Sequence, residues 1–149
     1  MGFRLGLQMM IGLPGDTLEK SVDTANRIVS LGAEDVRIYP LLVIKDTSLE
    51  TLYLQHKYEP LAIEMAVSWC KEIYLVFEKG GVNILRVGLH PSEGLMNGTS
   101  LVAGPFHISF RELVMTEIWK EQFSRIEKKR TKKYYSLSFT FRNKLFHWI

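Results

Sequence analysis

The chain has 149 residues, 46% of them hydrophobic, and a formal net charge of +3. This length allows one domain with a substantial core and hardly two. No apolar run approaches the roughly 20 residues that span a bilayer, no signal-like segment opens the chain, and the single cysteine, Cys70, excludes an internal disulfide framework. We therefore expect a protein of the reducing cytoplasm that makes no membrane contact.

Residues 4–12 are predicted to form the first strand, which is apolar and ends at a glycine turn. Gly12 and Gly15 are able to take positive φ angles and let a ligand approach the backbone, and Pro14 leaves no N–H group unpaired. α/β proteins bind anionic or dipolar ligands where a strand passes into a helix N-terminus. An ordinary connection between a strand and a helix has the same local features.

An amphipathic helix follows the turn, with Asp16 as its expected N-cap and Gly32 as the residue that ends it. Its apolar residues are Leu18, Val22, Ala25 and Val29. The second strand is predicted over residues 35–44. Residues 39–44 are apolar on both faces, which is typical of a central parallel strand covered by helices, and Pro40 indicates a bulge or bend within it.

Two helices are predicted between the second and third strands. A short helix begins near Thr47, and a long helix over residues 61–79 ends at Gly80. The expected apolar face of the long helix is Met65, Trp69, Ile73, Val76 and Phe77.

The third strand is predicted over residues 82–89, and the segment 91–108 is expected to be a long surface loop. A last helix begins at Ser109. Its apolar residues are Val114, Ile118, Trp119, Phe123 and Ile126. Strands that alternate with helices predict a right-handed parallel α/β arrangement. Three strands would leave two apolar edges unpaired, so the sequence indicates part of a barrel or of a larger sheet.

Basic residues concentrate at the C-terminus. From Arg125 onward there are eight basic residues and one acidic residue, whereas the first 124 residues carry a net charge of −4. Residues 127–149 begin as a charge run and continue with six aromatic residues, a pattern that suits RNA or membrane contact. The abrupt change in composition favours instead a poorly packed or non-native terminus. We assign residues 1–126 to the partial barrel and residues 127–149 to an irregular tail.

Two segments in tandem resemble a known family. Gln8–Thr17, with its Gly-Leu-Pro-Gly-x-Thr turn after an apolar strand, is similar to the penultimate strand-to-helix turn of radical S-adenosylmethionine (SAM) barrels, including oxygen-independent coproporphyrinogen oxidases. Arg37–Leu49 resembles the Lys-Ile-Tyr-Pro-x-Leu-Val-Ile-Arg-Gly-Thr-x-Leu segment of the Elongator catalytic subunit, and Asp46 departs from the glycine usual there. Arg86 also matches an arginine of that family. The resemblance covers about residues 3–120.

The resemblance implies a partial (βα) barrel of radical SAM type, with parallel strands and covering helices. In such enzymes a [4Fe-4S] cluster, bound by a Cys-x3-Cys-x2-Cys motif, cleaves SAM to a 5′-deoxyadenosyl radical. That motif is absent here, and Cys70 alone cannot hold a cluster, so we expect no metal ligands in this chain and identify no catalytic residue. The resemblance implies a SAM-binding set of Gly12, Leu13, Pro14, Gly15, Tyr39, Leu42 and Val43.

Three further polar residues stand at or near predicted strand ends, where α/β barrels collect their ligands. Lys45 and Arg86 suit a carboxylate or phosphate of the substrate or of SAM, and His90 suits a substrate contact or an acid–base role. Side chains that are only solvated, ion-paired or capping would stand at the same positions in the sequence, so these roles remain the alternative.

The sequence therefore predicts a fragment of a radical SAM iron–sulfur enzyme, a radical-generating oxidoreductase, that contributes part of the SAM pocket and is inactive alone. Its expected partners are the missing N-terminal half of the barrel and a substrate, either tRNA or a small molecule. The alternative is a non-enzymatic module that binds a small ligand at Gly12–Gly15 and RNA through the basic tail. A structural fragment without a ligand is a third interpretation.

Overall fold

A computed structural model describes residues 2–145 of the backbone and the side chains of residues 2–129. The chain divides into two compact units, Met1–Met115 and Thr116–Ile149. The first unit holds all the strands found in the described residues, and the described residues of the second unit are helical. The division lies within the last helix, as does the boundary predicted at residue 126.

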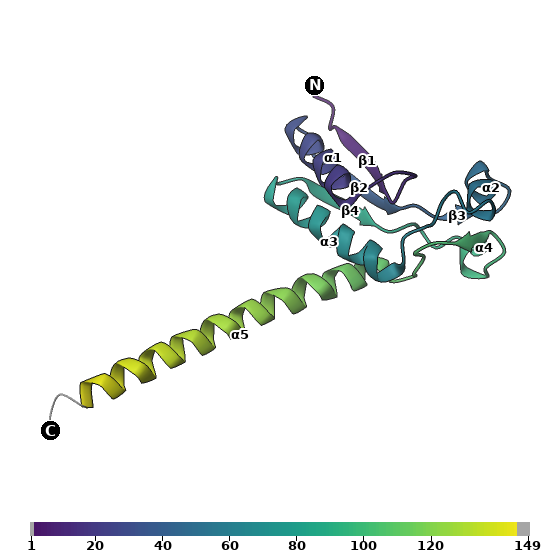
Figure 1. The fold of residues 1–149 in the computed structure, drawn as a ribbon. Helices are drawn as coiled ribbons and strands as arrows, with labels where there is room; N and C mark the ends of the chain where they lie inside the picture. The colour runs from purple at the N-terminus through teal and green to yellow at the C-terminus, as the bar shows by residue number, and fades with distance from the viewer. Residues whose placement is uncertain (1, 146–149) are drawn as a thin grey trace. The chain divides into compact units, whose positions relative to one another are not determined.

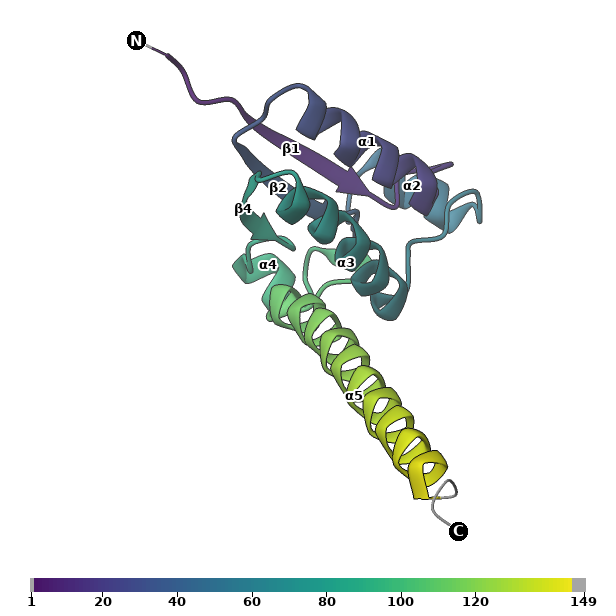
Figure 2. The same cartoon turned by 90° about the vertical axis from the view of Figure 1, so that its left-hand side faces the viewer.

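A three-stranded parallel sheet forms the centre of the first unit (Figure 1). β1 (Gly6–Ile11) pairs with β2 (Asp35–Pro40), and β2 pairs with β4 (Asn83–Val87). The helices α1 (Leu18–Ser30) and α3 (Ile63–Lys79) pack side by side along the sheet (Figure 2). Parallel strands that follow one another in space as in sequence, with their helices packed together, form an arc of a (βα) barrel. The predicted fold class is confirmed.

The sheet is buried on one face and open on the other. Val36 and Ile38 of β2 are completely buried, whereas Arg37 between them is exposed. In β1, Met9 is likewise buried and Met10 is 37% exposed. Cover on both faces was expected for residues 39–44, of which only Tyr39 and Pro40 belong to β2, and these two are half-buried and buried. The earlier residues of β2 are covered on one face only, because the helices cover that face and the alternating side chains of the other face point away from them.

The helices supply the opposite half of the core. α1 buries Ser21, Ala25 and Ile28, and α3 buries Ala66, Val67, Cys70, Ile73 and Phe77. The predicted apolar face of α3 is thus correct at Ile73 and Phe77 and wrong at Met65, which is 50% exposed. The small residues at 66 and 70, rather than the larger Met65, let α3 pack closely.

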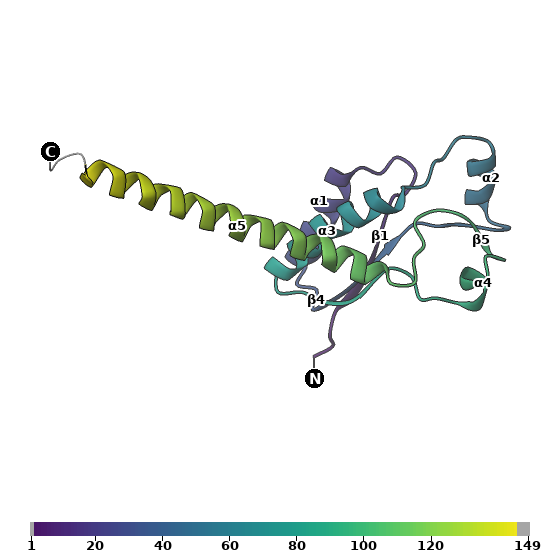
Figure 3. The ribbon, with the colours of Figure 1, turned by 90° about the horizontal axis from the view of Figure 1, so that it is seen from below.

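A second, antiparallel sheet follows directly after β2. Instead of one strand over residues 35–44, β2 ends at Pro40, and β3 (Val43–Ile44) pairs with β5 (Leu101–Ala103). The predicted loop 91–108 therefore contains β5 and also the short helix α4 (Glu93–Met96). Figure 3 shows α2, α4 and β5 grouped at one end of the first unit. α2 spans Ser48–Leu54, as the sequence predicted.

The last helix, α5, spans Phe110–Leu145. Phe110 and Val114 are buried in the first unit. In the second unit three of the apolar residues of the predicted last helix, Trp119, Phe123 and Ile126, are all more than half exposed. The expected irregular tail is wrong as far as Leu145, since the backbone there is helical. The predicted role of the tail's aromatic residues concerns side chains outside the described residues, and residues 146–149 lie outside them entirely.

Candidate functional site

The turn after β1 lies at the carboxyl end of the parallel sheet and has the backbone conformation that its glycines predicted. Gly12 and Gly15 have φ angles of 76° and 73°, values that side-chain-bearing residues rarely adopt. Leu13 between them is 46% exposed. A methyl group added at Gly15 would meet nothing within 4 Å, so the backbone here faces open space.

Asp16 fixes this turn rather than capping the helix. Its Oδ2 atom accepts hydrogen bonds from the Gly12 N–H at 2.9 Å and from the Ser21 hydroxyl at 2.8 Å, and its Oδ1 atom accepts from the Thr17 N–H at 2.8 Å. The N-cap of α1 is Thr17, whose hydroxyl accepts from the Lys20 N–H. The predicted cap at Asp16 is wrong by one residue, because its carboxylate reaches back to the turn.

Tyr58 holds the other side of the same turn. Its hydroxyl donates to the Gly12 carbonyl oxygen at 2.7 Å, and burial raises the pKa of the Tyr58 phenol. The Leu61 side chain lies 3.0 Å from where a Cβ of Gly12 would stand. Gly12 is thus enclosed while Gly15 is open. Sequence reasoning missed Tyr58, since no local pattern links it to a glycine 46 positions earlier.

The remaining residues of the predicted SAM-binding set differ in how far they are exposed to solvent. Tyr39 is half-buried and lies in register beside Met10 of β1. Leu42 and Val43 are 5% and 0% exposed, so both residues are buried in the core. Their roles, and those of Gly12, Leu13, Pro14 and Gly15, stay predictions.

The structure brings together two of the three predicted substrate residues. An Arg86 Nη1 atom lies 3.2 Å from His90 Nδ1. Arg86 also lines a hollow of about 230 Å³ beside β4, together with Gly88, His107 and Arg111. Lys45 follows β3 in the second sheet, where its N–H donates to the Ser100 carbonyl and its side chain is exposed.

Two polar residues that the sequence did not single out lie in the same cross-strand row of the sheet as Arg86. Gln8 of β1 is in register with Arg37 of β2, and Arg37 is in register with Arg86 of β4. Residues paired in a parallel sheet project to the same face, so these three side chains form a row on the open face. The alternation of these residues with apolar residues along each strand could have indicated an open face. In β2 the apolar run that follows Arg37 made this alternation hard to recognise.

An iron–sulfur cluster does not fit the residues of this chain. Cys70, the one cysteine, is completely buried in α3, and this burial raises the pKa of its thiol to about 12. A cluster needs several thiolates supplied together. Within the described residues, moreover, no three His, Cys, Asp or Glu side chains are grouped to hold a metal ion.

None of the helices in the described part of the chain is long and apolar enough to cross a membrane. The predicted cytoplasmic location stays a prediction.

The fold defines a class: an arc of a (βα) barrel with a glycine turn at its carboxyl edge. Within that class, residues 33–120 match the model of the Radical_SAM C-terminal domain family. This match covers more than half of the chain, which therefore belongs to that family. Radical SAM enzymes use SAM and a [4Fe-4S] cluster, and the chain holds no ligands for the latter.

Two individual proteins are similar to this chain. An uncharacterized protein of Methanocaldococcus jannaschii is 37% identical over 60 residues, which cover 40% of this chain and 19% of that protein. The solved structure of an archaeal Elp3 from Methanocaldococcus infernus, with an N-terminal deletion, matches with a TM-score of 0.69 at 23% identity. That match covers 80% of this chain and 28% of the Elp3 chain. The chain thus spans less than a third of either protein.

Proposed function

We propose that the turn Gly12–Gly15 and the neighbouring Tyr39 form part of the SAM pocket of a radical SAM enzyme. The observation that carries this proposal is the pair of left-handed glycines at the carboxyl edge of β1, where Gly12 is held by Asp16 and Tyr58 and Gly15 is open. A flat, polar-rimmed ring such as adenine needs such a close and rigid backbone surface.

The residues of this chain would bind and orient SAM rather than activate it. The backbone from Leu13 to Gly15 would lie against the adenosine, and Tyr39 would flank it from the adjacent strand. In radical SAM enzymes SAM is the source of the radical that attacks the substrate. Because Cys70 is buried and alone, we propose that this chain is inactive by itself.

The expected partners follow from the incomplete arc. We propose that the N-terminal half of a barrel, with the cluster motif, completes the site, and that the substrate is tRNA or a small molecule in the cytoplasm. The alternative role, RNA binding through the basic tail, stays a prediction because most of that tail lies outside the described side chains.

The test is a calorimetric titration with SAM of the chain and of two glycine variants. Gly15→Ala adds a methyl group over the open side of the turn. Gly32→Ala is the matched control, because Gly32 has a φ of 74° and its added methyl also meets nothing within 4 Å. Each substitution should cost about 1 kcal/mol of stability. Only Gly15→Ala should also weaken SAM binding, by about tenfold if the ring loses its close approach. Absent SAM binding, or equal loss in both variants, would overturn the proposal.

A further inference from the structure

The open face of the sheet carries a polar row that the SAM pocket does not use. Gln8, Arg37 and Arg86 stand side by side on three neighbouring strands, which are roughly 5 Å apart in a sheet. The register between β2 and β4 shifts after Val36, so that Arg86 rather than Leu85 faces Arg37. Such irregularities re-aim side chains and are common next to functional sites.

The carboxylate that lies beside this row in the sheet is hydrogen-bonded to other residues. The acidic group of the preceding row is Asp35, and both of its oxygens are already engaged: Arg4 donates to Oδ2 at 3.0 Å and to Oδ1 at 2.8 Å, and Asn83 donates to Oδ1 at 2.8 Å. Arg37 forms no hydrogen bond or ion pair with a described side chain, although its charge helps to lower the pKa of Asp35.

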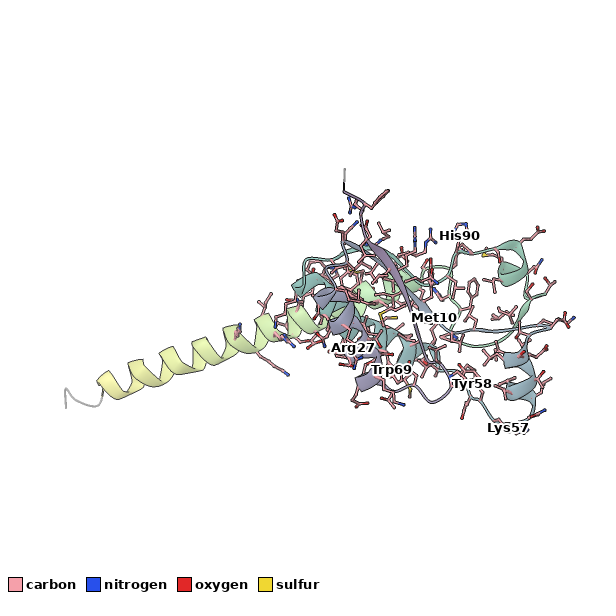
Figure 4. All side chains as sticks on the ribbon, turned by 90° about the horizontal axis from the view of Figure 1, so that it is seen from above. Met10, Arg27, Lys57, Tyr58, Trp69 and His90 are labelled. Carbon is pink, nitrogen blue, oxygen red and sulfur yellow. The ribbon has the colours of Figure 1, made fainter. Side chains whose placement is uncertain are left out.

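His90 orients Arg86 without neutralising it. The Arg86 guanidinium lies 3.2 Å from His90 Nδ1, and because a guanidinium can only donate, Nδ1 is the acceptor in this pair. Figure 4 shows His90 on the other side of β1 from Arg27 of α1 and Trp69 of α3, which agrees with a position on the open face. Two like charges at facing positions repel each other, so the row favours a bound anion.

We propose that Gln8, Arg37 and Arg86 bind the terminal phosphate of a phosphate monoester, with His90 as a positioning residue. A carboxylate has two oxygens, which is enough for the paired N–H groups of one guanidinium. A phosphate monoester has three terminal oxygens and up to two negative charges, so it can accept from both guanidinium groups and from the side-chain amide of Gln8. The assignment of this phosphate to the enzyme's substrate rests on the proposed function, since a barrel of this family encloses the open face. Phosphate binding itself does not depend on SAM.

The test is a titration of the chain with inorganic phosphate and with a small phosphate monoester, glycerol 3-phosphate, followed by calorimetry. Arg37→Gln and Arg86→Gln should each weaken binding about tenfold. Arg27→Gln is the matched control: it removes the same charge from the exposed surface of α1, where Arg27 pairs with Asp23, and should leave binding unchanged. Without phosphate, Arg37→Gln should raise the melting temperature because it removes the repulsion, a change that loss of a purely structural arginine would not produce.

His90 and the source of the phosphate are tested in the same assay. His90→Gln keeps an acceptor for Arg86 and should bind phosphate more tightly than His90→Ala. An RNA oligonucleotide without a terminal phosphate should bind without dependence on Arg37 and Arg86. Equal losses in all three arginine variants, no saturable phosphate binding, or RNA binding that depends on both arginines would overturn the proposal. If any of these outcomes is found while Arg37→Gln still binds SAM, the phosphate site is wrong and the proposed SAM pocket is not.

Discussion

At the scale of single residues, the turn after β1 is held by a hydrogen bond that spans a long stretch of sequence. Tyr58→Phe removes the hydroxyl that donates to the buried Gly12 carbonyl at 2.7 Å. The carbonyl is then left without its partner, which should lower the free energy of unfolding by about 1–3 kcal/mol. Urea denaturation near neutral pH measures this loss. An unchanged denaturation midpoint would mean that Gly12 is fixed by Asp16 and Leu61 alone.

The same variant has a defined pH dependence. Burial raises the pKa of Tyr58 above the ordinary phenol value of 10.0, so the folded state favours the neutral phenol. The stability linked to this group is fully present below about pH 10 and is lost as the pH rises through the raised pKa. The decline of stability above pH 10 should therefore be shallower in Tyr58→Phe than in the unmodified chain.

The conformation of the two glycines in this turn was predictable from the sequence, whereas the residues that hydrogen-bond to the turn were not. A Gly-Leu-Pro-Gly run after an apolar strand already requires a tight turn, and Gly12 and Gly15 have the positive φ angles that it predicted. Asp16 was misassigned because an aspartate before a helix has the same local pattern whether it caps the helix or bonds back to the turn. Tyr58 comes from a connector between helices, where no periodic pattern indicates burial.

At the scale of elements, the two covering helices meet at the end of α3, where Gly80 lies against Val29 of α1. A Cβ at Gly80 would stand 2.7 Å from Cγ1 and 2.8 Å from Cγ2 of Val29 in α1. Because valine has little freedom about its Cα–Cβ bond, Gly80→Ala should lower the free energy of unfolding by about 1–3 kcal/mol through overpacking. Gly80 has an ordinary φ of −78°, so the loss is steric rather than conformational.

A double-mutant cycle with Val29→Ala isolates this contact. Val29→Ala removes both methyl groups that the new Cβ would meet, so the double variant should recover most of the loss caused by Gly80→Ala. Chemical denaturation of the four proteins gives the coupling energy. Additive losses would show that α1 and α3 separate there without strain.

Long, periodic elements were predictable and short paired ones were not. β1 and α3 lie within the ranges predicted for them, and α1 follows the glycine turn as expected. β3 and β5 contain two and three residues, too few for an alternating pattern, and their pairing joins segments far apart in the sequence. The run from Tyr39 to Ile44 therefore looked like one buried strand, although the structure divides it between two sheets.

At the scale of the whole molecule, the incomplete barrel was predictable from the strand count, but its open face was not. Three parallel strands with helices between them indicate an arc, and family membership confirms its type. Which face of β2 is covered depends on helix packing across the sheet. The row Gln8, Arg37 and Arg86 becomes visible only when the register of all three strands is known.

An arc with unpaired edges should bind the strands that would complete it. Within the described residues β1 pairs only with β2, so its outer edge offers backbone N–H and C=O groups to another strand. We expect a separately expressed N-terminal half of a radical SAM barrel to form a stable complex with this chain and to raise its melting temperature. Size-exclusion chromatography and thermal denaturation of the mixture measure both effects.

The cluster motif of that half provides the control. Replacing its three cysteines by alanine should leave the complex intact, because association depends on strand pairing and on burial of apolar surface, but should abolish SAM cleavage. The Gly15→Ala variant of this chain should also associate normally, because Gly15 faces open space. The resulting complex should cleave SAM, but more slowly than the complex of the unmodified halves. If the two halves do not associate, or if this chain cleaves SAM without the other half, then completion by a barrel half is wrong.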